Sequence, residues 1–65
     1  MKYLILKQFI QGNDQIWVAK LNEADPIYIY NTIEEAEAKK AELEQDDPAR
    51  GFKITTVTDE EIAGL

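Results

Sequence analysis

Most of the side chains that carry enzyme chemistry are missing from this sequence of 65 residues. It contains no histidine, no cysteine and no serine. Acyl transfer by a Ser–His or Cys–His pair is therefore impossible within the chain, and no imidazole can act as a general base near neutral pH. Zinc also loses its usual nitrogen and sulfur ligands. For metal binding, only carboxylates remain.

Two acidic runs, EQDDP (44–48) and DEE (59–61), could in principle hold a hard cation. Neither run has the alternating ligands and central glycine of a calcium loop. Two carboxylates can hydrolyse a glycosidic bond only across a substrate cleft, and a domain this short has little room for one. The glycines are isolated, so there is no phosphate-binding loop. We therefore expect no catalytic residue, no metal site and no cofactor, and we predict that the chain is not an enzyme.

The net charge of −6 is spread unevenly along the chain. Residues 1–20 carry three lysines against one acid, whereas residues 21–65 carry twelve acids against four basic side chains. An excess of acids opposes binding to nucleic-acid phosphates and favours solubility. The apolar run between Lys2 and Lys7 is shorter than a signal peptide or a membrane span requires. These features predict a soluble cytoplasmic protein.

The hydrophobic pattern predicts a single small α+β domain with the order β-β-β-α-β. The predicted strands cover residues 2–10, 15–21, 27–30 and 52–57. Gly12 and Asn13 can form a two-residue hairpin turn between the first two strands, and Pro26 can open the third. We expect a mostly antiparallel four-stranded sheet in the strand order 4-1-2-3, with the helix packed on one face.

A capping box marks the start of the predicted helix. The hydroxyl of Thr32 can accept from the backbone N–H of Glu35, and the Glu35 carboxylate can reach back to Thr32. Acids at positions 34, 35 and 37 suit the positive end of the helix dipole. A run of helix-breaking residues after position 45 ends the helix.

A second capping box, at Thr58 and Glu61, lies close to the end of the sequence. So few residues follow it that we expect a short helical turn or a frayed tail rather than a stable helix. The predicted domain therefore spans residues 1–58, and residues 59–65 form a C-terminal tail or short helical turn.

A two-residue turn divides the predicted hairpin into two faces. It places Phe9 opposite Ile16 and Lys7 opposite Val18, on one face with Tyr3 and Ile5. The other face carries Leu4, Leu6, Trp17, Ala19 and Leu21. We expect the helix on this second face, because it has no charge and Ala19 leaves room for close approach.

The first face would then be uncovered, and contiguous apolar surface usually has a partner or a cover. The tail could close over it with Ile62 and Leu65, a second copy or another protein could pack there, or aromatic rings and lysines could stack single-stranded nucleic acid. The fourth alternative is an ordinary sheet with its faces assigned the wrong way round. If Ile27 and Ile29 meet the helix, Tyr28 and Tyr30 join the uncovered face.

We predict a non-enzymatic protein–protein interaction or accessory domain, including a homodimer formed through the uncovered face or an edge strand. Single-stranded nucleic-acid binding is the alternative, and no small-molecule ligand is predicted. The predicted partner-binding residues are Tyr3, Phe9, Ile16, Val18, Tyr28 and Tyr30.

Overall fold

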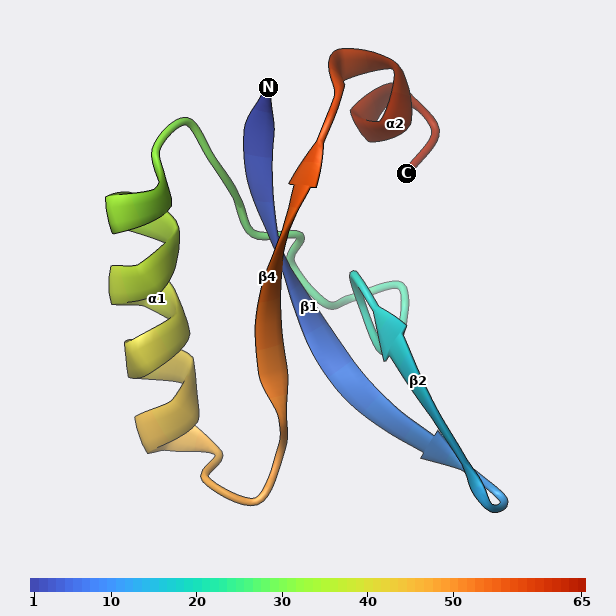
Figure 1. Ribbon diagram of the computed structural model, residues 1–65. Helices are drawn as coiled ribbons and strands as arrows, with labels where there is room; N and C mark the ends of the chain where they lie inside the picture. Colours follow the sequence, from blue (N-terminus) through green and yellow to red (C-terminus); the bar gives the residue numbers. More distant parts are fainter.

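The computed structural model describes residues 1–65, and its sheet is built around one long first strand (Figure 1). Six elements follow along the chain: β1 (Lys2–Gln11), β2 (Asp14–Val18), β3 (Ile29–Tyr30), α1 (Ile33–Asp46), β4 (Phe52–Val57) and α2 (Asp59–Ala63). All pairings are antiparallel, and each of the other strands pairs with β1. The predicted α+β class and the β-β-β-α-β order are confirmed.

The predicted strand order is right for β4 and wrong for β3. β4 lies beside β1, as expected, but β3 pairs with β1 and not with β2. The N–H of Ile5 donates to Tyr28 O on the β3 side, and the N–H of Gln8 donates to Gly51 O on the β4 side. A ten-residue strand is about 33 Å long. One edge of β1 therefore has room for β2 and β3 in succession, and the other edge carries β4.

The turn between β1 and β2 has the predicted two residues. Gln11 pairs with Asp14, and the register matches Phe9 with Ile16 as expected. Gly12 has a φ of 62°, whereas no other residue of the chain has a positive φ. A glycine with positive φ at the first turn position is the type II′ pattern, which suits the twist of a hairpin.

Both predicted helix starts are capped by threonine. The Thr32 hydroxyl accepts from the N–H of Glu35 at 3.3 Å, although the Glu35 carboxylate accepts from that hydroxyl and not from the Thr32 amide. At α2 the capping box is complete, since the Thr58 amide also donates to the Glu61 carboxylate. Neither helix has the length and apolar character needed to cross a bilayer.

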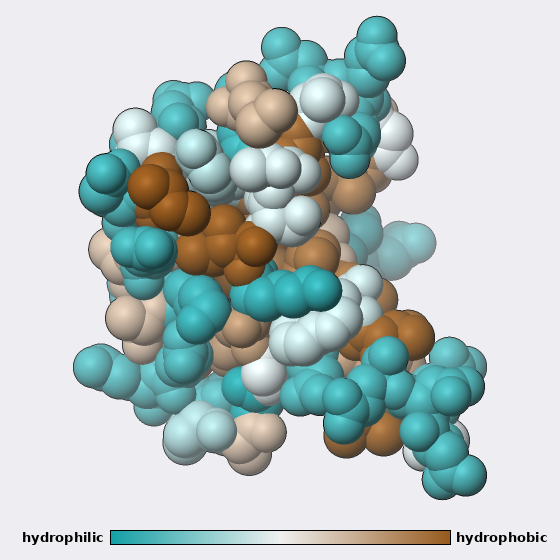
Figure 2. All heavy atoms as spheres, in the orientation of Figure 1, coloured by the Kyte–Doolittle hydropathy of each residue, from teal (hydrophilic) through white to brown (hydrophobic).

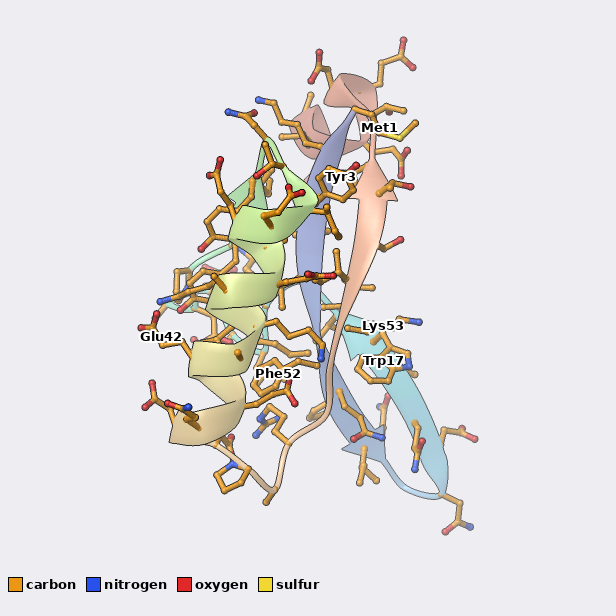
Figure 3. All side chains as sticks on the ribbon, turned by 60° about the vertical axis from the view of Figure 1, so that its left-hand side comes forward. Met1, Tyr3, Trp17, Glu42, Phe52 and Lys53 are labelled. Atoms are coloured by element: carbon orange, nitrogen blue, oxygen red, sulfur yellow. The ribbon has the colours of Figure 1, made fainter.

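α1 covers the face of the sheet that carries Ile5 and Lys7. The register places both on the same side as Phe52 and Ile54 of β4, and these β4 side chains line a hollow with Ile33 of α1. Figure 3 shows Phe52 between α1 and the sheet. Ile5 is completely buried there, as is Ala36 of α1, so part of the core lies between α1 and the sheet.

The prediction that the helix covers the opposite face, expected to carry Leu4, Leu6, Ala19 and Leu21, is therefore wrong. Leu21 lies beyond β2 and borders a hollow with Lys7 and with Leu43 of α1. The prediction depends on Lys7 staying in water, whereas Lys7 is buried. Its ammonium donates to Pro26 O at 3.3 Å and pairs with the Asp25 carboxylate at 3.3 Å. A buried charge is tolerated where it is paired and hydrogen-bonded. The charge on this face is thus compensated locally, and the helix can lie over it.

α2 lies on the other side of the sheet from α1, beyond the end of β4 (Figure 1). Of the β-strand residues facing away from α1, Leu4 and Val57 are buried. In the tail, Ile62 is half-buried and Leu65 is exposed. The C-terminal segment therefore does not act as a lid that buries both of these apolar side chains.

Candidate protein-interaction site

The β1–β2 hairpin extends away from α1 and from the rest of the sheet (Figure 1). β4 pairs with β1 only as far as Lys7, so residues 8–18 form a two-stranded ribbon, which we call the hairpin arm. A two-stranded hairpin has no second layer of its own to bury its side chains. The arm is therefore the part of the sheet most open to a partner.

Large exposed apolar side chains gather on the hairpin arm. Of the six in the chain, four lie here: Phe9 (41% exposed), Ile10 (63%), Ile16 (38%) and Trp17 (36%). The other two, Met1 and Leu65, are the chain ends. In Figure 2, hydrophobic atoms are visible among the hydrophilic ones at the lower right, where the arm projects.

Both faces of the hairpin arm carry such side chains. The register places Phe9 directly opposite Ile16, and strand alternation puts Ile10 and Trp17 on the other face. Scattered single apolar residues on a surface are ordinary, but a contiguous group on a small protein indicates a contact site. The hairpin arm is therefore the candidate site.

Trp17 leans inward across β1. The Nζ of Lys53, on β4, lies 4.8 Å from the centroid of its ring, and Figure 3 shows the two side chains together. The register places Leu6 beside Lys53 and Gln8 beside Trp17, so the pair spans the central strand. A cation over an indole face is attractive, and here it holds the ring over the sheet. The outer edge of β2 is left clear of the indole.

The two edges of the hairpin arm differ. On the β4 side, Gln8 is engaged twice: its N–H donates to Gly51 O, and its carbonyl accepts from Arg50 Nη1 at 2.9 Å. A hollow of about 330 Å³ follows along this edge, bordered by Ile10 and Asp47 among others. The guanidinium also pairs with the Asp47 carboxylate at 3.0 Å. Arg50 therefore closes the start of this edge, and the β2 edge has no comparable cover.

A partly buried ion pair lies at the base of the hairpin arm. Lys7 pairs with Asp25, and its Nζ lies 5.2 Å from the ring centroid of Tyr28. The N–H of Leu21 donates to the Asp25 carboxylate at 2.7 Å. This amide, aided by Lys7 and opposed by desolvation, lowers the pKa of Asp25 from its ordinary value. The cluster fastens the segment between β2 and β3 to the central strand.

One of the predicted partner-binding residues, Tyr28, lies in this cluster, and Tyr3 and Tyr30 pair with each other farther along β1 and β3. Tyr3, Tyr28 and Tyr30 are half-buried on the face covered by α1. The Nζ of Lys39, on α1, lies 5.2 Å from the Tyr28 ring centroid, and its pKa is raised mainly by a hydrogen bond to Glu42. The structure does not bring the tyrosines to the arm, and they are not part of the candidate site.

The other predicted residues lie together on the hairpin arm. Phe9 and Ile16 are exposed, and Val18 is half-buried at the base of the arm. Ile10 and Trp17 are not among the predicted residues, because the helix was expected on their face of the sheet. The signal for them is strand length: β1 has ten residues and β4 has six, so part of β1 must extend beyond its partner.

The fold and the candidate site define a small α+β domain with a projecting apolar hairpin. No three His, Cys, Asp or Glu side chains are grouped so that they could hold a metal ion. Comparison of the chain with protein-family models finds no match, and comparisons with curated proteins and with solved structures find none either. The function of the chain must therefore be inferred from the geometry of the site.

Proposed function

We propose that this chain is a non-enzymatic protein-interaction domain that contacts its partner through the hairpin arm. The observation that carries the proposal is the concentration of exposed Phe9, Ile10, Ile16 and Trp17 on one projecting ribbon. Burying such side chains against a partner removes apolar surface from water, at about 25 cal/mol per Å². Aromatic residues at the centre of a contact patch are typical of protein interfaces.

The distribution of charge supports a protein partner. The chain has a net charge of −6, yet Asp14 is the only charged residue between positions 8 and 18. Charged residues are depleted at the core of protein–protein interfaces. The arm combines this depletion with exposed aromatic rings, which is the composition expected of a contact surface.

Single-stranded nucleic acid is the second candidate. The pairing of Lys53 with Trp17 favours it, because an exposed ring beside a cation can stack a base and contact its phosphate. The net charge of −6 opposes it. A titration of labelled single strands at low salt tests this reading: binding that disappears in Trp17→Ala would support it, and no binding would end it.

A capture experiment from the native host tests the protein-interaction proposal. The tagged chain is compared with the double variant Ile10→Thr/Ile16→Thr, which keeps β-branched residues in both strands. Ala38→Gln, an exposed substitution on α1, is the matched control. We expect the chain and the control to retain the same partner, whether a second copy or another protein, and the double variant to lose it. Equal retention by all three would contradict the proposal.

A further inference from the structure

The outer edge of β2 has unpaired backbone groups. Gln8 donates its N–H toward Gly51, on the side of β1 away from β2. Because peptide groups alternate along an antiparallel ladder, the residue opposite Gln8 also directs its peptide groups out of the hairpin. That residue is Trp17, and Gln15, opposite Ile10, behaves in the same way. Both residues are exposed, and β2 has no second strand partner.

This edge lacks the protection that natural sheets normally give an edge strand. Free edges are usually shielded by lysine, proline, a bulge or a very short strand. β2 reads DQIWV, five residues in regular pairing without lysine or proline. By contrast, β3 has two residues, and β4, whose Lys53 reaches inward to Trp17, has none of the exposed large apolar side chains that β2 has. The β2 edge combines an unprotected ladder with exposed apolar side chains, and it is therefore the one best able to accept another strand.

We propose that a second copy of this chain occupies the edge, with its β2 antiparallel to this β2 about a two-fold axis at Ile16. The proposal rests on the proposed function and names its partner. Gln15 then lies opposite the partner's Trp17, and each of these residues donates and accepts a backbone hydrogen bond. The sheet continues from β4, β1 and β2 of one copy into β2, β1 and β4 of the other.

The distribution of charge along β2 permits a second copy in this register. Two chains of net charge −6 repel each other, so they can meet only where charge is sparse. Asp14, the only charge of the strand, lies opposite the partner's Val18. The two Asp14 residues are then about 14 Å apart, because four residues of strand separate them. Like charges are kept apart while the apolar residues meet.

The apolar side chains match themselves at the two-fold axis. Ile16 faces the partner's Ile16 in a pair without hydrogen bonds between its own residues, the kind in which side chains approach most closely. Phe9 lies beside Ile16 on the same face, so the two aromatic rings flank the paired isoleucines. Two copies thus cover an apolar surface that each leaves open alone.

Single-cysteine cross-linking tests both the contact and its register, because the chain has no cysteine of its own. Across such a pair the Cα atoms lie about 4.5 Å apart, within the range that a disulfide spans. We expect Ile16→Cys to form a disulfide dimer at least about tenfold faster than Asp14→Cys or Ile10→Cys, whose sites are separated in this arrangement. Equal rates for the three variants, or no dimer from Ile16→Cys, would overturn the proposal.

A proline substitution tests the edge hydrogen bonds. Gln15→Pro removes an N–H that faces away from β1, so the ladder within the hairpin keeps its donors. Gln15→Thr is the matched control because it retains this N–H. In sedimentation equilibrium we expect the unmodified chain and Gln15→Thr to dimerise, and Gln15→Pro to raise the dimer dissociation constant about tenfold or more. Equal dissociation constants for folded Gln15→Pro and Gln15→Thr would contradict β2 pairing.

The two proposals can fail separately. If the unmodified chain remains a monomer at high micromolar concentration, the second copy is wrong. If the chain is a monomer but captures a foreign protein that Ile10→Thr/Ile16→Thr does not capture, the hairpin arm remains an interaction site. If the chain is a monomer and the double variant captures the same proteins as the unmodified chain, both proposals are wrong.

Discussion

The two halves of β1 are in opposite environments although they belong to one strand. In the first half, β3 and β4 flank the strand and α1 covers one face, and Ile5 is completely buried. In the second half, β2 is the only strand partner and no helix lies over the ribbon, and Ile10 is the most exposed isoleucine of the chain (Figure 1). Ile5 and Ile10 are the same type of residue, so the difference in their burial comes from the strands and helices that pack around each of them.

This contrast indicates different roles for the two halves. The first half supplies apolar burial, on which a domain of 65 residues depends. So short a chain buries only about 60% of the surface that its unfolded form exposes. The second half contributes exposed apolar surface, which costs solubility unless something binds it. We therefore propose that the protein uses one end of β1 for folding and the other for contact.

The largest expected difference is between the same substitution at the two ends of β1. Ile5→Ala creates a cavity in the core and should lower the free energy of unfolding by about 2–5 kcal/mol, which is enough to unfold much of so small a domain. Ile10→Ala, the matched control, should change it by less than about 1 kcal/mol. Urea denaturation followed by circular dichroism measures both. Similar losses would show that the hairpin arm shares the core.

Substitution of the buried Lys7 should have the next largest effect on the free energy of unfolding. Lys7→Met keeps the apolar stem but leaves Asp25 and the carbonyl of Pro26 without their partner. We expect a loss of about 1–3 kcal/mol in the free energy of unfolding. Lys20→Met, at an exposed lysine without an ion pair, should change stability by less than about 0.5 kcal/mol. If both variants are equally stable, Lys7 does not fasten the core.

Lys7 also shows why the sequence predicts one part of the fold and not another. The element order, the Gly12 turn and the caps at Thr32 and Thr58 depend on residues a few positions apart, and all of them could be predicted. Burial of Lys7 depends on Asp25, eighteen residues away, and on the path of the intervening segment. A lysine read alone indicates solvent, so the helix was expected on the wrong face.

The candidate site was partly predictable for the same reason. Phe9 and Ile16 follow from the turn, since hairpin register is set by loop length. Whether Tyr28 shares their surface depends on β3 pairing with β1, a long-range choice that strand propensity does not determine. Exposure of Ile10 and Trp17 depends on where β4 ends relative to β1. Residues close together in the sequence therefore predict the hairpin, whereas its exposed surfaces depend on long-range strand pairing.

The hairpin turn should tolerate substitution of Gly12 poorly, although a side chain there would have free space. Gly12 has a φ of 62° and no atom near the position that a Cβ would take. The cost of Gly12→Ala is therefore a backbone cost, about 1–2 kcal/mol. Gly64→Ala, at a negative φ with ordinary contacts, should stay within about 0.5 kcal/mol of the unmodified chain. Amide exchange should rise in residues 8–18 of Gly12→Ala more than in β4. Uniform acceleration along the chain would contradict a separable arm.

The smallest expected effect is a loss of folding stability at acidic pH, confined to the part of the domain outside the hairpin arm. The pKa of Asp25 is lowered in the folded state from 3.8, mainly by the Leu21 amide. Its carboxylate therefore stabilises the fold above about pH 3.8, and this contribution is lost as the pH falls through the folded-state pKa. Asp25→Asn lacks this dependence, so the stability difference between the unmodified chain and the variant should shrink on acidification. Amide exchange should show the loss at Leu21 and not at Ile16, because the hairpin arm has no part in this ion pair. An equal response at both amides would mean that the two halves of β1 unfold as one unit, and the separation between folding and contact would then be wrong.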